Sequence, residues 1–139
     1  MRFVDTNVFV RYLSGEETNL TQIAQDVFDP IHGDDSSFTT NDAVIAEVIY
    51  VLTSPKLYRL NRNNVVNRLQ AVLQLPACRL ASLPIISEAM FIWEHHSKLS
   101  FVDALCIATA SGYDLELVTF DTALAKVANI TRWDLRPPS

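Results

Sequence analysis

Short apolar runs and longer amphipathic stretches alternate along this chain, which predicts an alternation of strands and helices. Met1–Asp5 has the length of a buried strand, and Leu115–Phe120 is the clearest second one. Residues 38–40 form a further candidate strand, and Ile130–Leu135 is a weak final candidate. Apolar residues recur at helical spacing between these runs. The expected helices are Thr6–Leu13, residues 20–28, 41–52, 65–73, 85–96 and 101–110, and Thr122–Ala128.

This alternation, with almost no hairpin signals, favours an α/β fold. The βαβ connections that it implies produce a mostly parallel sheet with helices on both faces. A length of 139 residues with 49% hydrophobic content suits one domain with a real core, expected over residues 1–139. Open α/β sheets bind ligands at the carboxyl ends of their strands. Asp5 and Asp121 each follow a predicted strand, so we expect both at that edge.

Four acidic residues lie within or directly after apolar runs. They are Asp5, Glu47, Asp103 and Asp121. Acidic side chains are rarely buried unless they are paired or bind a metal, so these apolar surroundings favour a shared cation. Carboxylate oxygens suit Mg²⁺ or Mn²⁺, and such an ion can activate water for attack on a phosphodiester. The pattern therefore predicts metal-assisted phosphodiester hydrolysis.

Each acid also has a structural explanation. Asp5 and Asp121 precede predicted helices and can cap them, and Asp103 can complete a capping box with Ser100. Glu47 lies in mid-helix, where no backbone amide is free, so its alternative is a buried pair with an arginine. A capping acid can also face a ligand, so these interpretations do not exclude a metal site.

Composition limits the other classes of function. The net charge of −5 argues against holding nucleic acid by a bulk positive field, although a bound divalent metal would reverse the local sign. No apolar run approaches the roughly 20 residues of a membrane span, so a soluble, cytoplasmic protein is expected. Cys78 and Cys106 lack paired spacing and are predicted to be reduced core residues. His32, His95 and His96 lack the spacing of a zinc site.

The densest basic segment contains Lys56, Arg59 and Arg62, with Arg68 beyond them and Tyr58 among them. Cations beside an aromatic ring suit phosphate contact and base stacking on single-stranded RNA. A solvated loop and helix face is the alternative, because surface lysines and arginines are common. The segment is therefore a candidate RNA-binding site at Lys56, Arg59 and Arg62.

The acidic segments carry a resemblance to a known family. Phe3–Leu13, with the sequence FVDTNVFVRYL, resembles the opening of PIN-domain nucleases, and of VapC-type toxins in particular. The apolar helix around Glu47 and the segments FVDAL at Asp103 and VTFD at Asp121 resemble the later acidic motifs, in the family's order. This resemblance spans nearly the whole chain. It implies a three-layer α/β/α sandwich with a mostly parallel central sheet.

The resemblance also implies an activity and partners. It points to a Mg²⁺- or Mn²⁺-dependent endoribonuclease, usually a homodimer, that acts as a toxin and is neutralised by an antitoxin covering the active site. The metal-binding and catalytic acids would be Asp5, Glu47, Asp103 and Asp121. Thr6, Asn7 and Thr119 match flanking polar positions and would orient carboxylates or water. The alternative for these three is the ordinary polar residue of a helix start or strand end.

Two competing functions remain. A non-catalytic PIN-like module would use the same scaffold to contact RNA or protein, with its acids only capping helices. A phosphatase of the haloacid-dehalogenase type is the weaker alternative, because that opening motif requires a second aspartate where this chain has Asn7.

Overall fold

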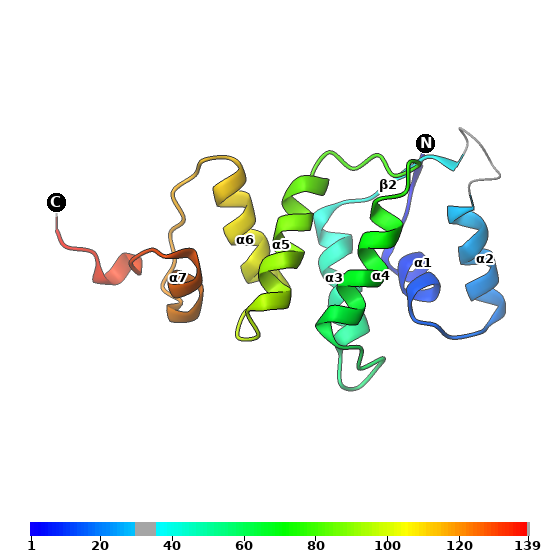
Figure 1. Cartoon of the computed structure of the whole chain (residues 1–139), viewed down its shortest axis with the longest axis horizontal. Coiled ribbons are helices and arrows are strands. Elements are labelled where there is room, and N and C mark those ends of the chain that lie inside the picture. The colour runs from blue at the N-terminus through cyan, green and yellow to red at the C-terminus, as the bar shows by residue number, and fades with distance from the viewer. Residues whose placement is uncertain (30–35, 139) are drawn as a thin grey trace. The chain divides into compact units, whose positions relative to one another are not determined.

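The computed structural model describes residues 1–29 and 36–138, which fold into two compact units. The first unit runs from Met1 to Leu83, and the second runs from Pro84 to the end of the chain. Figure 1 colours the first unit from blue to green and the second from green to red.

The first unit combines a small parallel sheet with helices. Strand β1 pairs in parallel with β2, with Arg2 opposite Phe38 and Phe3 opposite Thr39. The chain passes through two helices between the strands, which is the βαβ connection that the sequence predicts. In chain order the elements are β1 (Arg2–Phe3), α1 (Thr6–Leu13), α2 (Asn19–Phe28), β2 (Phe38–Thr39), α3 (Asp42–Thr53) and α4 (Arg62–Leu73).

An aromatic cluster forms the core between the sheet and the first two helices. The ring of Phe28 lies 5.5 Å from Phe9, 5.0 Å from Phe38 and 4.6 Å from Tyr12, measured between centroids. Helix α1 packs against α2 and α3, and α3 packs against α4 (Figure 1). The apolar residues of α3 recur at helical spacing and therefore lie on one face of the helix, which is buried. That face consists of Ile45, Val48, Ile49 and Leu52.

The second unit is helical in its described residues. Its elements are α5 (Leu83–His95), which starts at the last residue of the first unit, α6 (Phe101–Gly112), α7 (Thr122–Ala128) and the 3₁₀ helix η2 (Trp133–Leu135). Trp93 of α5 is buried and meets Phe101 of α6 edge to face, with 6.2 Å between ring centroids. This contact joins the two longest helices of the unit.

The strand predicted at Leu115–Phe120 is wrong. In the described chain these residues form an irregular connection from α6 to α7, and Leu115, Val118 and Phe120 are 60%, 53% and 69% exposed. A run of apolar and β-branched residues favours a strand, but a strand forms only where a neighbouring strand pairs with its backbone hydrogen-bonding groups. The strand predicted at Ile130–Leu135 is also wrong, since the chain there turns into η2.

The cysteine prediction is partly correct. Cys78 and Cys106 are both free thiols. Cys78 is half-buried, and this burial raises the pKa of its thiol. Cys106 is exposed on α6, so its assignment to the core is wrong. Within residues 1–29 and 36–138, the structure contains no helix with the length and apolar character needed to span a membrane.

Candidate active site

Asp5 lies where β1 ends and α1 begins. Its backbone is extended, and its carboxylate oxygen Oδ1 accepts a hydrogen bond from the backbone amide of Thr6 at 2.7 Å. The capping alternative is therefore confirmed for this residue. The residue is exposed, and its second carboxylate oxygen accepts no hydrogen bond from the described residues. The acid thus stands at the carboxyl end of a strand, as the sequence predicts.

Glu47 lies in the middle of α3 and is also exposed. The hydroxyl of Thr6 donates to its Oε2 at 3.5 Å, the long limit of a hydrogen bond. Thr6 itself is buried. This one residue therefore contacts both acids, Asp5 through its amide and Glu47 through its hydroxyl. The packing of α1 against α3 thus brings Glu47 to the residue that follows Asp5, although the two acids are far apart in the sequence.

Within the described residues, no basic side chain compensates these two acids. Neither Asp5 nor Glu47 forms an ion pair in that part of the chain, so the alternative of a buried arginine partner for Glu47 is wrong. Asp5, Glu47 and Asp121 are exposed although each has apolar neighbours in the sequence. Apolar neighbours in sequence do not bury a side chain that points away from the core. The first unit thus presents two negative charges to solvent.

Asp5 and Glu47 suit a hard divalent cation, because they offer negatively charged oxygen donors that are exposed to solvent. Mg²⁺ is typically held by one or two carboxylates and keeps several waters, for which exposed ligands leave room. An ion would also offset the repulsion between the two carboxylates. Within neither unit do the described residues gather three or more acidic, histidine or cysteine side chains into a metal-binding group. Among the described residues of the first unit, Asp5 and Glu47 are the candidate ligands that contact the same residue, Thr6.

Asp103 is the third residue of α6 and forms a capping box. Its backbone amide donates to the hydroxyl of Ser100, and its Oδ2 accepts from the backbone amide of Ser100, both at 3.1 Å. The capping alternative is confirmed here as well. The reciprocal bonds hold the carboxylate in one orientation at the start of the helix. Its other oxygen, Oδ1, accepts no hydrogen bond from the described residues.

Asp121 caps α7 and is oriented by a neighbouring threonine. Its Oδ1 accepts from the backbone amide of Leu124 at 2.8 Å. The hydroxyl of Thr119 accepts from the backbone amide of Asp121 at 3.0 Å, and the carbonyl of Thr119 accepts from Trp133. Thr119 therefore contacts the backbone of the acid and not its carboxylate. Asp103 and Asp121 are the two site candidates of the second unit.

Asn7 forms no hydrogen bond with the four acids among those that the described residues show. It is exposed on α1 and lines a groove of about 310 Å³ between α1 and α2, together with Val8 and Leu20. None of the four acids lines this groove. The position after Thr6 therefore faces the second helix, because successive residues of a helix point in different directions.

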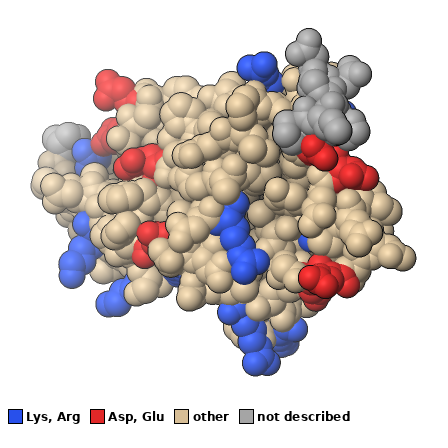
Figure 2. All heavy atoms as spheres, turned by 45° about the vertical axis from the view of Figure 1, so that its right-hand side comes forward, with Lys and Arg blue, Asp and Glu red and all other residues tan. Residues whose placement is uncertain are grey.

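The basic segment lies in the connection from α3 to α4. Lys56 and Arg59 are exposed, and Arg62 begins α4 with a partly buried side chain, whose desolvation lowers its pKa. Figure 2 shows Lys and Arg side chains gathered at the lower edge of the face in view, the level of this connection in Figure 1. Arg68 is half-buried, and its guanidinium donates to the carbonyl of Leu13.

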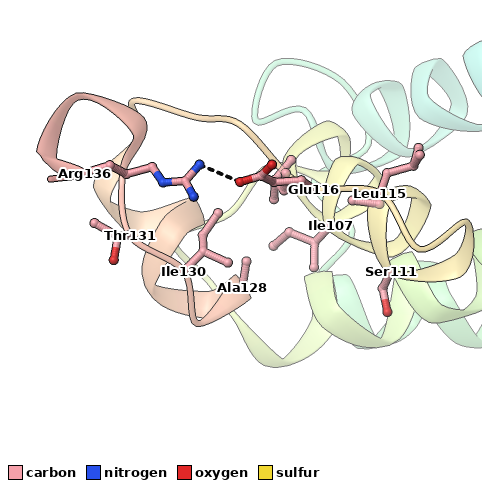
Figure 3. Close-up of a pocket in the computed structure, with 10 residues that line it drawn as sticks. Ile107, Ser111, Leu115, Glu116, Ala128, Ile130, Thr131 and Arg136 are labelled. Atoms are coloured by element: carbon pink, nitrogen blue, oxygen red, sulfur yellow. Dashed lines mark hydrogen bonds and ion pairs between the residues drawn. The ribbon is translucent and has the colours of Figure 1, made fainter. Parts of the chain in front are cut away.

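A cavity of about 430 Å³ in the second unit has a different character (Figure 3). Its walls are mainly apolar side chains such as Ile107 and Ile130. The charged residues Glu116 and Arg136 form an ion pair with each other, drawn as a dashed line in Figure 3. None of the four acids lines this cavity, so it carries no part of the predicted hydrolytic chemistry.

Sequence reasoning missed one polar residue beside the first pair of acids. Thr40 is buried, and its hydroxyl donates to the carbonyl of Val4, the residue before Asp5. Thr40 and Asn41 directly precede α3, and both are residue types that commonly cap helices. The structure assigns the cap to Asn41, which accepts from Val44 at 2.9 Å. No sequence signal distinguishes the two. His32 lies outside the described residues.

Comparison with known proteins identifies one family. The model of the family described as PIN domain matches residues 2–130, which is most of the chain. The match confirms the predicted α/β fold class, with helices as the larger part and a small parallel sheet in the described residues. A search of curated proteins found no matching relative.

Proposed function

The chain belongs to the PIN domain family, and we propose that it is a divalent-metal-dependent endoribonuclease that hydrolyses RNA phosphodiester bonds. PIN domains are commonly nucleases. The observation that carries the proposal is that one residue of the first unit, Thr6, contacts both Asp5 and Glu47. The family match crosses the boundary between the two units, which supports one nuclease domain over residues 1–139.

The proposed ligands of Mg²⁺ or Mn²⁺ are Asp5, Glu47, Asp103 and Asp121. When bound, such an ion acts as a Lewis acid that activates water and offsets the charge of the phosphodiester. The chain's own contribution is orientation. Asp5, Asp103 and Asp121 each use one carboxylate oxygen to cap a helix, so the other oxygen points in a defined direction. The hydroxyl of Thr6 does the same for Glu47.

We further propose that this nuclease is a cytoplasmic toxin that acts as a homodimer and is neutralised by a cognate antitoxin. The resemblance of its acidic motifs to VapC-type toxins supports this role. A neighbouring reading frame that encodes a small protein with a DNA-binding amino terminus would favour it. Expression without that neighbour is expected to arrest growth, whereas joint expression is not.

The first test is the metal requirement. Purified protein is expected to cut single-stranded RNA only with added Mg²⁺ or Mn²⁺, because the proposed catalytic groups are ligands and not nucleophiles. A cation that binds only the native state at 100 times its dissociation constant stabilises that state by about 2.7 kcal/mol. Cleavage of labelled RNA and thermal unfolding, each with Mn²⁺ and with EDTA, measure both effects. Undiminished cleavage in excess EDTA would defeat the proposal.

A non-catalytic binding module is the second candidate, and one observation favours it. Three of the four acids cap helices, so capping alone could explain their presence. This candidate predicts RNA binding without cleavage and no stabilisation by Mn²⁺. The same two measurements therefore separate the candidates.

The basic segment gives a prediction about RNA affinity. Replacing Lys56, Arg59 and Arg62 by alanine is expected to weaken RNA binding and to lower the slope of log affinity against log salt concentration by about 2. Each phosphate contact with a single strand contributes about 0.7 to that slope. Binding of a fluorescent RNA at several salt concentrations measures it.

The matched control removes three exposed cations elsewhere. Arg79, Lys98 and Lys126 lie outside the basic segment and are all exposed. Their joint replacement by alanine changes the net charge equally. If both triple variants lower the slope to the same extent, the segment has no special role and net charge alone governs binding.

A further inference from the structure

Thr40 is a buried polar residue at the end of β2, only 6% exposed. Its hydroxyl donates to the carbonyl of Val4 at 2.9 Å, across 36 positions of sequence. A buried hydroxyl is retained at low cost only when it is hydrogen-bonded. This bond satisfies the hydroxyl and, at the same time, the carbonyl at the end of β1.

The bond from Thr40 takes the place of the next backbone hydrogen bond between the two parallel strands. Backbone amides of Arg2 and Val4 donate to Ser37 and Thr39 at 3.0 and 2.9 Å. Beyond Thr39 the described residues form no further backbone hydrogen bond between the two strands. Asn41 is still extended, and its side chain caps α3. The carbonyl of Val4 would then lack a backbone partner. The side chain of Thr40 supplies the missing donor and closes the sheet at this end.

The hydrogen bond between Thr40 and Val4 lies at the end of the sheet from which β1 continues to Asp5 and β2 continues to the helix that carries Glu47. The carbonyl of Val4 belongs to the peptide group that leads into Asp5, and Thr40 immediately precedes the cap of α3, the helix that carries Glu47. The only hydrogen bond between α1 and Glu47 that the described residues show is the one from Thr6 at 3.5 Å. That contact is already at its limit, so a shift of a few tenths of an ångström between the two helix starts would break it.

We propose that Thr40 is a positioning residue for the metal-binding pair, and that its hydroxyl sets the separation of the Asp5 and Glu47 carboxylates. The inference rests on the proposed function, because it assigns Thr40 an effect on a divalent cation. Thr40 itself touches neither acid in the described structure, so its influence acts through the backbone of Val4.

Three variants separate the hydroxyl from the volume of the side chain. Thr40→Val keeps the shape and removes the donor, which leaves the Val4 carbonyl without its partner. Thr40→Ser keeps the donor and removes one methyl group. Thr40→Ala removes both and is the replacement to use if Thr40→Val does not fold. Thr21→Val is the matched control, because Thr21 is also buried in the first unit and its hydroxyl donates to the carbonyl of Glu16.

The experiment titrates Mn²⁺ into metal-free protein by calorimetry and measures kcat and KM for RNA cleavage. Thr40→Val is expected to weaken Mn²⁺ binding about 10-fold or more, the range seen when groups that orient metal ligands are removed. Its kcat should fall while its KM for RNA stays close to that of the natural protein. Thr40→Ser should restore both values. Thr21→Val should lower thermal stability without changing Mn²⁺ affinity.

The possible failures are distinguishable. If the natural protein binds Mn²⁺ and cuts RNA, but Thr40→Val and Thr40→Ala bind Mn²⁺ equally well, the positioning role is wrong and the proposed function stands. The positioning role is equally wrong if Thr21→Val weakens Mn²⁺ binding as much as Thr40→Val, since the effect is then general destabilisation. If the natural protein neither binds Mn²⁺ nor cuts RNA, the proposed function fails and this inference fails with it.

Discussion

Asp5→Asn is expected to lower RNA cleavage at least about 100-fold while the protein remains folded. Loss of a metal ligand removes several kcal/mol of transition-state stabilisation, and each 1.4 kcal/mol corresponds to a factor of about ten in rate. Asparagine caps helices about as well as aspartate, so the bond from the amide of Thr6 can be kept. The substitution therefore removes the charge and spares the cap.

The measurement compares cleavage rate, Mn²⁺ affinity and thermal unfolding. Asp26→Asn is the matched control, because Asp26 is exposed in the first unit and forms no part of the proposed site. It changes the net charge equally and should cut RNA at the normal rate. Asp5→Asn protein that still cuts RNA at that rate would show that Asp5 only caps α1.

Replacing Asp103 is expected to have the second large effect on RNA cleavage. Its capping of α6 and its proposed role as a metal ligand can be tested separately. Asp103→Asn keeps an oxygen that can accept from the amide of Ser100 but loses the charge. We expect it to lose cleavage about 100-fold or more and to keep its thermal stability. Asp103→Ala should lose the cleavage and also about 1 kcal/mol of stability, the typical value of a cap.

Ser100→Ala provides the opposite control. It removes the other half of the capping box and none of the four proposed ligands. We expect a loss of stability similar to that of Asp103→Ala, with cleavage retained. Thermal unfolding and cleavage of the same RNA test all three variants. If Asp103→Asn cuts as fast as Ser100→Ala, the capping box is the whole function of Asp103 and the binding-module candidate gains support.

Local chemistry made much of the fold predictable. The bounds of α1 and α7 agree with those expected from the sequence, since Asp5 and Asp121 cap the two helices. Helices α2 to α6 follow their apolar periodicity, with ends shifted by a few residues. The pairing of β1 with β2 joins the two amino-terminal segments that the sequence predicts as strands. The helices and their ends depend on residues that are neighbours in the sequence. The pairing of β1 with β2 does not, but it follows from a single βαβ connection.

The sequence by itself determined the helices, the caps at Asp5, Asp103 and Asp121 and the order of the four acids, because each depends on residues within a few positions of one another. Tertiary structure alone decided which acids are exposed, that Thr6 contacts both Asp5 and Glu47, and that Thr40 closes the sheet. It also decided that residues 115–120 pair with no strand in the described chain. Such outcomes depend on partners brought from distant positions, and a local pattern does not specify those partners.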